Sequence, residues 1–288
     1  MKPDYVKVKI PTGPEYVMIK GTLRERSLHT VCEEARCPNI SECWESGTAT
    51  FMIMGKNCSR GCRFCSVTHG GMTELDVDEP DKVYDSVIRM GLSYVVITSV
   101  DRDDLEDQGS GHFARVIERV KETGALVEVL IPDFRGEESH LDRIISAEPA
   151  VIAHNIETVE RLSPSIRDPR AGYRQSLKVL RYVKSSSPRM VTKSSIMVGL
   201  GETDQEVLQS MDDLRSVGVD ILTIGQYLRP SKKQVEVYQY SSVERFRLFE
   251  EEGYRRGFSF VASGPLVRTS YRAAEAWTRR KLLNGRDN

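Results

Sequence analysis

The residues with the clearest chemical potential are the cysteines, all six of which stand in two triplets near the N-terminus. The triplets are Cys32, Cys37 and Cys43, followed by Cys58, Cys62 and Cys65. The second has the spacing C-x-x-x-C-x-x-C, which predicts a cubic 4Fe–4S cluster held by three thiolates. Its fourth iron would stay open, and an open iron can chelate the amino and carboxylate groups of a ligand such as S-adenosylmethionine. The first triplet, C-x4-C-x5-C, predicts a second 4Fe–4S cluster that also lacks one ligand.

Other uses of the cysteines fit the sequence less well. Disulfide bonds need an oxidising compartment, and no apolar signal segment precedes residue 30. Structural zinc prefers four ligands with paired C-x-x-C spacings, and neither triplet has a fourth Cys or His at a fixed short offset. Iron–sulfur ligation therefore explains the six cysteines best. Unpaired cysteines also predict a reducing, cytoplasmic location.

The overall composition excludes several classes of function. The chain carries 41 Lys and Arg against 42 Asp and Glu, a net charge of −1, so no broad basic field predicts a nucleic-acid partner. No run of about 18 apolar residues predicts a membrane span. At 288 residues the chain is long enough to bury one large core.

Apolar runs that are typical of buried strands alternate with helical patterns along the chain. The predicted strands cover residues 49–54, 94–99, 126–131, 150–153, 192–198 and 221–225. The predicted helices cover residues 79–91, 112–124 and 203–218, with a further helix from 241–244 onward. Thr203–Glu206 and Ser241–Glu244 each match the capping-box pattern that opens a helix. A strand-like segment follows at Phe258–Val261.

Six strand–helix repeats predict an α/β fold, an incomplete parallel (β/α)6 barrel with N- and C-terminal extensions. We expect residues 1–47 to form an N-terminal extension that carries the first triplet. Residues 48–230 would form the barrel, and residues 231–288 a C-terminal extension. Because six repeats do not close a barrel, a lateral mouth would remain for a large substrate.

Candidate binding residues converge on one end of this predicted barrel. In parallel β/α folds, sites form from the loops after the strands, and the second triplet follows the first predicted strand directly. Polar residues at or near the other strand ends are candidates for binding S-adenosylmethionine: Thr98, Ser99, Asp101, Asn155, Glu157, Lys193, Gln226 and Tyr227. Each alone is a weak signal, because loops are polar by default. Phe64 either packs beside the cluster or the adenine, or fills the site as an apolar plug.

The second triplet predicts radical chemistry. A reduced cluster at Cys58, Cys62 and Cys65 would pass one electron into the sulfonium of S-adenosylmethionine, releasing methionine and a 5′-deoxyadenosyl radical. Such a radical abstracts hydrogen from an unactivated carbon, which acid–base chemistry cannot do. The cofactor carries this step, while the protein orients and shields it.

Longer motifs surround the triplets. Residues 28–40 read LHTVCEEARCPNI and lead into Glu42-Cys43-Trp44, while residues 263–271 read SGPLVRTSY. Together with C-x-x-x-C-x-F-C, these motifs resemble those of lipoyl synthases, a family of radical S-adenosylmethionine enzymes. The resemblance runs from about Lys2 to Tyr271. The spacing of the second triplet is typical of the whole superfamily, whereas C-x4-C-x5-C and Arg-Thr-Ser-Tyr are much more specific.

The resemblance implies a substrate and partners. It implies that two sulfur atoms are inserted, at C6 and C8, into an octanoyl chain attached to a lysine of a carrier protein. The cluster at the first triplet would donate the sulfur, with Ser270 as its missing ligand. The implied carrier is a lipoyl domain or a glycine-cleavage H protein. The other implied partners are an electron donor such as flavodoxin or ferredoxin and an iron–sulfur cluster carrier.

The chain departs from the family pattern at five positions. Thr269 replaces the first serine of an Arg-Ser-Ser-Tyr motif, and Ser195 stands where glycine is usual. Glu160 stands at a common proline, Lys56 at an expected aspartate, and Gln234 near an expected histidine. These departures bear on carrier preference and on cofactor contacts around Ser195 rather than on the reaction class.

Two alternative functions stay open at this level. One is another radical enzyme with an auxiliary cluster that inserts sulfur, of the biotin synthase or methylthiotransferase kind. The other is a non-enzymatic cluster carrier or electron-transfer module. The tail motif disfavours the first, and a six-repeat barrel around an open iron disfavours the second.

Overall fold

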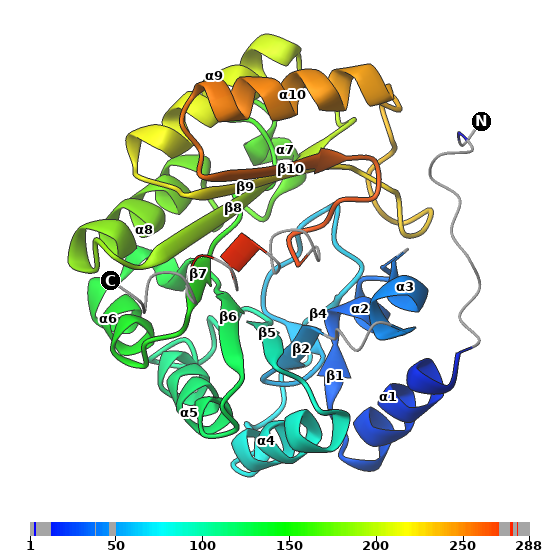
Figure 1. The fold of residues 1–288 in the computed structure, drawn as a ribbon, viewed down its shortest axis with the longest axis vertical. Coiled ribbons are helices and arrows are strands. Elements are labelled where there is room, and N and C mark those ends of the chain that lie inside the picture. The colour runs from blue at the N-terminus through cyan, green and yellow to red at the C-terminus, as the bar shows by residue number, and fades with distance from the viewer. Residues whose placement is uncertain are drawn as a thin grey trace.

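A curved parallel sheet organises the protein (Figure 1). The computed structural model describes residues 13–37, 39–45 and 50–270, together with residues 3, 277, 278 and 281. The sheet order is β1-β2-β5-β6-β7-β8-β9-β10, and all pairs are parallel except β1 with β2. Its strands are β1 (His29–Thr30), β2 (Thr50–Ile53), β5 (Tyr94–Ser99), β6 (Leu126–Leu130), β7 (Val151–Ala153), β8 (Val191–Val198), β9 (Ile221–Gln226) and β10 (Phe260–Gly264).

Helices cover the outside of this curved sheet (Figure 1). Those that connect or follow the barrel strands are α4 (Glu79–Met90), α5 (Ser110–Lys121), α6 (Glu138–Ser146), α7 (Ser163–Ile166), α8 (Tyr173–Ser186), α9 (Asp204–Ser216) and α10 (Val243–Arg255), with a 3-10 turn, η2 (Phe134–Gly136). Before the barrel come α1 (Pro14–Glu25), α2 (Val31–Glu34) and α3 (Ile40–Glu45). A second, two-stranded sheet joins β3 (Asn57–Cys58) to β4 (Thr68–His69). No described helix is long and apolar enough to span a bilayer.

The predicted parallel, incomplete barrel is confirmed. Each of the six predicted strands appears, with ends that differ by no more than one residue, and Ala49 lies outside the described residues. The helix predicted at residues 79–91, α4, ends where predicted, because Gly91 adopts the left-handed conformation (φ +61°) that terminates helices. The helix expected from His112 begins two residues earlier, at Ser110.

Besides the antiparallel β1, one parallel strand extends the sheet beyond the six predicted repeats. The segment expected at Phe258–Val261 forms β10 at Phe260–Gly264, and it pairs in parallel with β9. The sheet therefore has a seventh parallel strand, with β1 and β10 at its two edges. Because β10 belongs to the predicted C-terminal extension, the boundary at residue 230 falls between two strands of one sheet. The division of the chain into 1–47, 48–230 and 231–288 stays a prediction.

The two predicted capping boxes had different outcomes. At Thr203 the box is present, because the Thr203 hydroxyl accepts from the Glu206 backbone and the Glu206 carboxylate accepts from the Thr203 backbone. The box predicted at Ser241–Glu244 is wrong by one residue. Ser242 caps α10 by accepting from the backbone of Arg245. A basic side chain at that position cannot accept the return hydrogen bond, so half of the motif is missing.

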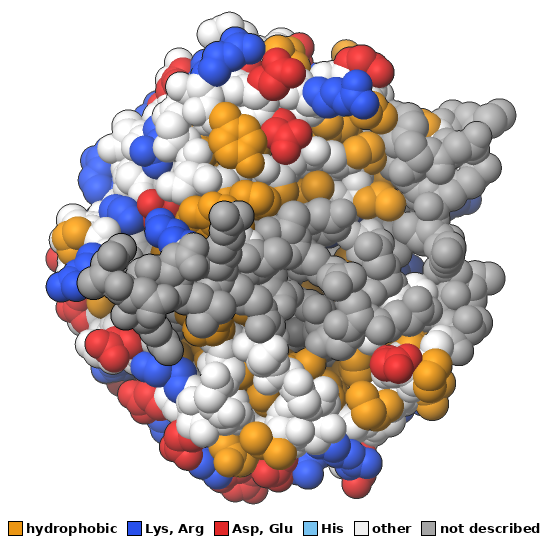
Figure 2. Space-filling view, in the orientation of Figure 1, with side chains coloured by type: hydrophobic (Ala, Val, Ile, Leu, Met, Phe, Trp, Pro, Cys, Tyr) orange, Lys and Arg blue, Asp and Glu red, His pale blue; other side chains and the backbone are white. Residues whose placement is uncertain are grey.

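The core holds the barrel and the first-triplet segment together. One apolar cluster joins α1 and α3 to β2, β5, β6 and the helices around them, and a second joins β8 and β9 to α9 and α10. Trp44 is fully buried and packs 4.8 Å from the ring of Tyr16, which fixes α3 on α1. Positive and negative side chains are interspersed around the rim of the face in Figure 2, as the net charge of −1 predicts.

The Thr203 cap gives a stability prediction. Replacing Thr203 with Ala removes the side-chain acceptor of α9, and we expect a loss of about 1 kcal/mol in the free energy of unfolding. Urea denaturation followed by circular dichroism measures it. The exposed neighbour Gln205→Ala is the matched control and should change the free energy by less than about 0.5 kcal/mol. Equal effects of the two substitutions would contradict the role of the cap.

Candidate functional site

A cavity of about 380 Å³ opens at the carboxyl ends of the barrel strands. It is lined by Thr98 and Ser99 at the end of β5, Leu130 at the end of β6, and Gln226 at the end of β9. Both cysteine triplets line the same cavity, and so does Ser270 near the other end of the chain. Two segments near the N-terminus therefore meet one near the C-terminus, at the end of the sheet where the site was expected.

The chemistry of the cysteines fits iron–sulfur clusters. All six are free thiols, Cys32 buried and the others half-buried. Burial raises the pKa of Cys32, Cys58 and Cys62 to about 12 and that of Cys65 to about 11, so cluster assembly must displace their protons. Among the described residues, no group of three or more His, Cys, Asp or Glu could hold a single metal ion. In a cubic cluster each thiolate binds a different iron, so the thiolates lie farther apart than around one zinc.

Backbone geometry shapes the loop of the second triplet, residues 57–69, here called the cluster loop. It follows β2 through two residues with positive φ, Met54 (+66°) and Gly55 (+86°). The β3–β4 pairing closes its two ends. Backbone N–H groups of Arg60 and Asp101 each lie 3.4 Å from the sulfur of Cys58, and that of Asp168 lies 3.3 Å from the sulfur of Cys62. Such N–H···S contacts stabilise negative charge on the sulfurs of a bound cluster.

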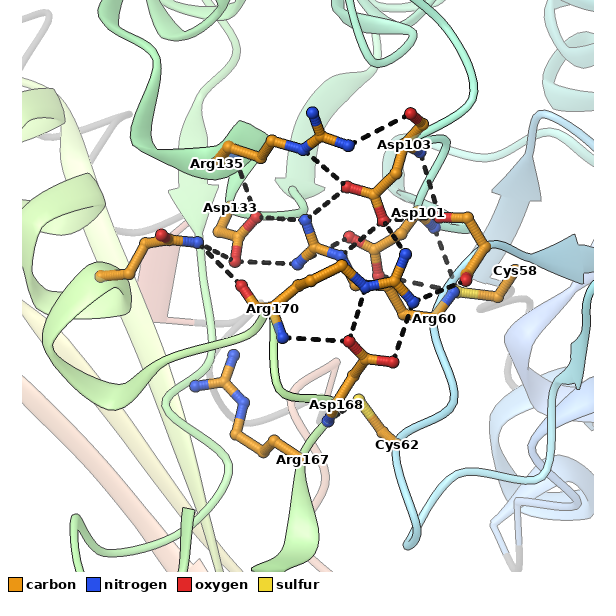
Figure 3. A network of polar contacts seen from close by, with 12 residues as sticks. Cys58, Arg60, Cys62, Asp101, Asp103, Asp133, Arg135, Arg167, Asp168 and Arg170 are labelled. Atoms are coloured by element: carbon orange, nitrogen blue, oxygen red, sulfur yellow. Dashed lines mark hydrogen bonds and ion pairs between the residues drawn. The ribbon is translucent and has the colours of Figure 1, made fainter. Parts of the chain in front are cut away.

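Arg60 anchors the cluster loop from within (Figure 3). Its guanidinium binds both oxygens of Asp103 at 2.8–2.9 Å and both oxygens of Asp133 at 2.8–2.9 Å. Asp101 lies 3.3 Å away. Burial alone would raise the pKa of Asp103 and of Asp133. Hydrogen bonds from Arg60 outweigh burial and hold both pKa values below the ordinary value. The loop after β2 is thereby fixed to the loops after β5 and β6.

A second anchor joins the cluster loop to the loop after β7 (Figure 3). Asp168 accepts from the backbone of Gly61 at 2.8 Å and from the Arg170 guanidinium at 2.8–3.0 Å. Arg170 in turn donates to the carbonyl of Ser59 at 2.9 Å. Arg60, Asp168 and Arg170 were not predicted as site residues. The acidic residues between Asp101 and Asp104 are the feature of the sequence that indicates a buried basic partner.

Two predicted contacts for S-adenosylmethionine have unsatisfied polar atoms in the cavity. The Ser99 hydroxyl and the Asn155 carbonyl oxygen are buried and have no hydrogen-bond partner among the described residues, and both residues line the cavity. Buried polar atoms normally have partners, so these two favour a polar ligand at this place. Asp101 and Glu157 also line the cavity, where burial raises the pKa of Asp101 to about 6 and raises that of Glu157.

Other predicted contacts for S-adenosylmethionine also line the cavity, but their polar atoms form hydrogen bonds within the protein. Thr98 donates to Leu130, and the Tyr227 hydroxyl donates to Val235. The Gln226 amide bonds the backbone at Tyr227, Gln239 and Ser241. Phe64 lines the cavity and packs against the apolar cluster of Ile166, Leu200 and Tyr227. That packing favours the apolar-plug interpretation of Phe64.

Lys193 is not brought to the cavity. Its side chain is fully buried inside the sheet, and its ammonium binds Glu128 at 2.6 Å. Glu128 also accepts from the hydroxyl of Tyr94 at 2.5 Å. A buried Lys–Glu pair of this kind has its charges satisfied within the barrel. The partner Glu128 lies on β6, two strands away from Lys193 on β8, and the role of Lys193 in cofactor binding stays a prediction.

Three contacts hold the C-terminal segment 265–270, here called the tail, over the cavity. Asn39, between Cys37 and Cys43, donates to the carbonyl of Leu266 at 2.6 Å. Gly225 lies so close that a Cβ there would stand 2.1 Å from the carbonyl oxygen of Val267. Asn155 donates to the Thr269 hydroxyl at 2.9 Å. These contacts bring Ser270 to the cavity, while Tyr271 lies outside the described residues.

The departures from the family pattern fall at distinct places. Gln234 donates to the carbonyl of Cys65 at 3.0 Å, so it supports the cluster loop. Ser195 lines the cavity and donates to the carbonyl of Thr223. Glu160 forms a surface pair with Arg174, and Lys56 is exposed. Gln234, Ser195 and Thr269 are thus the departures that bear on the site.

The fold and this cavity define a radical S-adenosylmethionine enzyme. The family model for the radical SAM superfamily matches residues 52–214. Solved structures share the fold: methylornithine synthase has a TM-score of 0.55 at 12% identity, covering 90% of this chain and 81% of that one. The hydrogenase maturase HydG from Carboxydothermus hydrogenoformans has a TM-score of 0.56 at 12% identity, covering 93% and 78%.

Within that superfamily, the chain belongs to the lipoyl synthase family. The model for the N-terminal domain of lipoyl synthase matches residues 1–37. A lipoyl synthase of Picrophilus torridus is 67% identical over 98% of both chains. One of Halobacterium salinarum is 54% identical over 99% of this chain and 94% of its own, and one of an Anaeromyxobacter species is 53% identical over 98% and 97%. The protein is therefore a sulfur-inserting enzyme that uses S-adenosylmethionine and two 4Fe–4S clusters.

The contact between Asn155 and Thr269 makes Thr269 a positioning residue for the tail. Thr269→Ala removes the hydroxyl and leaves the Asn155 amide short of a partner, a loss of about 1 kcal/mol in tail placement. We expect roughly fivefold slower lipoyl formation, measured by mass spectrometry of the product, with unchanged cleavage of S-adenosylmethionine. Thr269→Ser keeps the hydroxyl and is the matched control. Equal rates for the Ala and Ser variants would show that the hydrogen bond is unimportant.

Proposed function

We propose that each triplet has a separate task within lipoyl synthesis. Cys58, Cys62 and Cys65 hold the cluster that cleaves S-adenosylmethionine. The first triplet holds the sulfur-donating auxiliary cluster, with Ser270 as the fourth ligand. The observation that carries this proposal is that both triplets and Ser270 line one cavity, beside unsatisfied polar atoms of Ser99 and Asn155.

Bound together, the clusters and S-adenosylmethionine supply hydrogen abstraction from unactivated carbons and the sulfur that replaces the hydrogen. The chain supplies position and shielding. Ser99 and Asn155 offer their free oxygens to the cofactor, and Phe64 closes the apolar wall of the cavity. The tail covers the auxiliary side, so water is kept from the reacting carbons.

The substrate we propose is an octanoyl chain on the lysine of a lipoyl domain or a glycine-cleavage H protein. The relatives named lipoyl synthase support this, since they match nearly the whole chain. The long acyl-lysine side chain of the carrier protein would enter the cavity, which lies at the open end of the barrel. We also propose an electron-donor protein and an iron–sulfur cluster carrier as partners. A cytoplasmic location stays a prediction from the free cysteines.

Replacing one triplet at a time tests the assignment. The Ala triple variant of Cys58, Cys62 and Cys65 should contain one cluster per chain and form no 5′-deoxyadenosine. The Ala triple variant of the first triplet should also contain one cluster, but should still form 5′-deoxyadenosine without lipoyl product. Each variant controls for the other, and iron, sulfide and nucleoside analyses provide the measurements. Cleavage that survives loss of the second triplet would reverse the assignment.

Ser270 gives a sharper test, because it depends on one hydroxyl. Ser270→Ala removes the oxygen that would bind the auxiliary cluster, so lipoyl formation should fall at least tenfold while S-adenosylmethionine cleavage continues. Ser270→Cys restores an iron ligand, and we expect cluster assembly with poor sulfur insertion, since a thiolate binds iron more firmly than a serine oxygen. Mössbauer spectra of the auxiliary cluster and product mass measure both effects. Wild-type lipoyl formation by Ser270→Ala would rule out the ligand role.

A further inference from the structure

A second hollow lies on the outer side of the cluster loop. Its volume is about 1030 Å³, and its walls are residues 61–69 of the cluster loop and residues 229–238 of the segment between β9 and α10, with Leu200. We call it the outer hollow. Cys62 and Cys65 line both the outer hollow and the inner cavity. A single layer of chain, the cluster loop itself, therefore separates the ligands of the proposed radical cluster from the protein surface.

The outer hollow carries a concentrated positive charge. Arg63, Lys232 and Lys233 line it and are exposed, and none forms an ion pair with another described residue. The fourth basic residue, Arg229, is paired with Glu236 at 2.9 Å. The excess of about three positive charges contrasts with the net charge of −1 for the chain. Positive charge gathered in one concave surface attracts an acidic partner and speeds its association.

The two walls of the outer hollow are joined to each other. The backbone of Val235 donates to the carbonyl of Arg63 at 3.0 Å, and Gln234 donates to the carbonyl of Cys65 at 3.0 Å. Arg229 holds the turn of the outer wall through the carbonyls of Lys232 and Gln234. The lysines are thus presented by a braced loop that touches the cluster loop directly. A protein bound to this loop lies within one chain layer of Cys62 and Cys65.

We propose that the outer hollow is the docking surface for the electron donor, a small acidic protein that carries one electron at a time. This inference rests on the proposed function, because it needs the radical cluster at Cys58, Cys62 and Cys65. The donor passes one electron to that cluster and is itself oxidised by one electron. Electron transfer slows steeply with distance, so the thin wall of the outer hollow favours this surface. The substrate cavity opens on the other side of the same loop, so donor and substrate do not compete for space.

Charge reversal at the two lysines tests the proposal. The variant Lys232→Glu/Lys233→Glu should bind a reduced acidic ferredoxin, used as the probe, at least tenfold more weakly than the unmodified enzyme. The affinity of the unmodified enzyme should fall as salt rises, because salt screens exposed charges. Calorimetric titration of the cluster-loaded enzyme gives the affinity. Stopped-flow reduction of the cluster by the same ferredoxin gives the association rate. This rate should fall in the lysine variant together with the affinity.

The matched control reverses two exposed arginines at the opposite end of the barrel. Arg181 and Arg189 lie on α8 and in the segment before β8, at the amino ends of the strands, and neither is paired with a described residue. The variant Arg181→Glu/Arg189→Glu changes the net charge by the same amount and should bind ferredoxin like the unmodified enzyme. Equal weakening by both double variants would mean a general charge effect and would overturn the docking site.

Dithionite separates this inference from the proposed function. It reduces the cluster without docking, so the Lys232/Lys233 variant should form 5′-deoxyadenosine and lipoyl product at the normal rate with dithionite. If the unmodified enzyme makes no lipoyl product with dithionite, the proposed function fails whatever the ferredoxin data. If the lysine variant has a raised KM for the octanoylated carrier under dithionite, the outer hollow binds the carrier and the donor proposal is wrong. Unchanged ferredoxin affinity in the lysine variant also overturns it.

Discussion

The site depends on one buried cation. Arg60 lies between the first two cysteines of the cluster loop. Its guanidinium binds Asp103 and Asp133, which follow β5 and β6. Three charge-assisted hydrogen bonds and a further ion-pair contact to Asp133 fix its position. Without Arg60 the negative carboxylates would be left buried. Removing one partner from such a group costs about 3–5 kcal/mol. The cluster loop, which must hold its cysteines at fixed positions, is therefore anchored to the loops that follow β5 and β6.

The auxiliary side of the cavity is built differently. Cys32 and Cys43 come from short helices before the barrel, and Cys37 from the segment between those helices. Ser270 comes from the tail after the last strand. The hydrogen bond from Asn39 to Leu266 joins the first-triplet segment to the tail. The hydrogen bond from Asn155 to Thr269 and the close approach of Val267 to Gly225 join the tail to the barrel. Uncharged hydrogen bonds contribute less than buried ion pairs with several partners. A strongly anchored cluster loop beside a more lightly anchored first triplet suits the proposed division between a radical cluster that is kept and an auxiliary cluster that is consumed.

Local sequence patterns predicted the elements and the ligands better than the contacts between them. Strand positions, the Thr203 cap and the convergence of cysteines on one end of the sheet follow from periodicity and spacing. The partners of Arg60 could not be predicted, because Asp103 and Asp133 lie 43 and 73 residues away. The pairing of Lys193 with Glu128 could not be predicted for the same reason, because Glu128 lies 65 residues away. Ser270 came from a motif, since no local pattern connects it to Cys43.

The cluster loop also separates two kinds of access. Its inner face lines a narrow cavity with unsatisfied polar atoms, which suits a small polar cofactor and an acyl arm. Its outer face lines a wider hollow with three exposed basic side chains that form no ion pair within the described part of the chain, which suits a protein surface. Radical chemistry needs water excluded from the reacting carbons, whereas electron delivery needs closeness to the surface. The cluster loop is one chain layer thick and is held in place by buried ion pairs rather than by a thick apolar core. It can therefore shield the inner cavity and still leave Cys62 and Cys65 close to the surface.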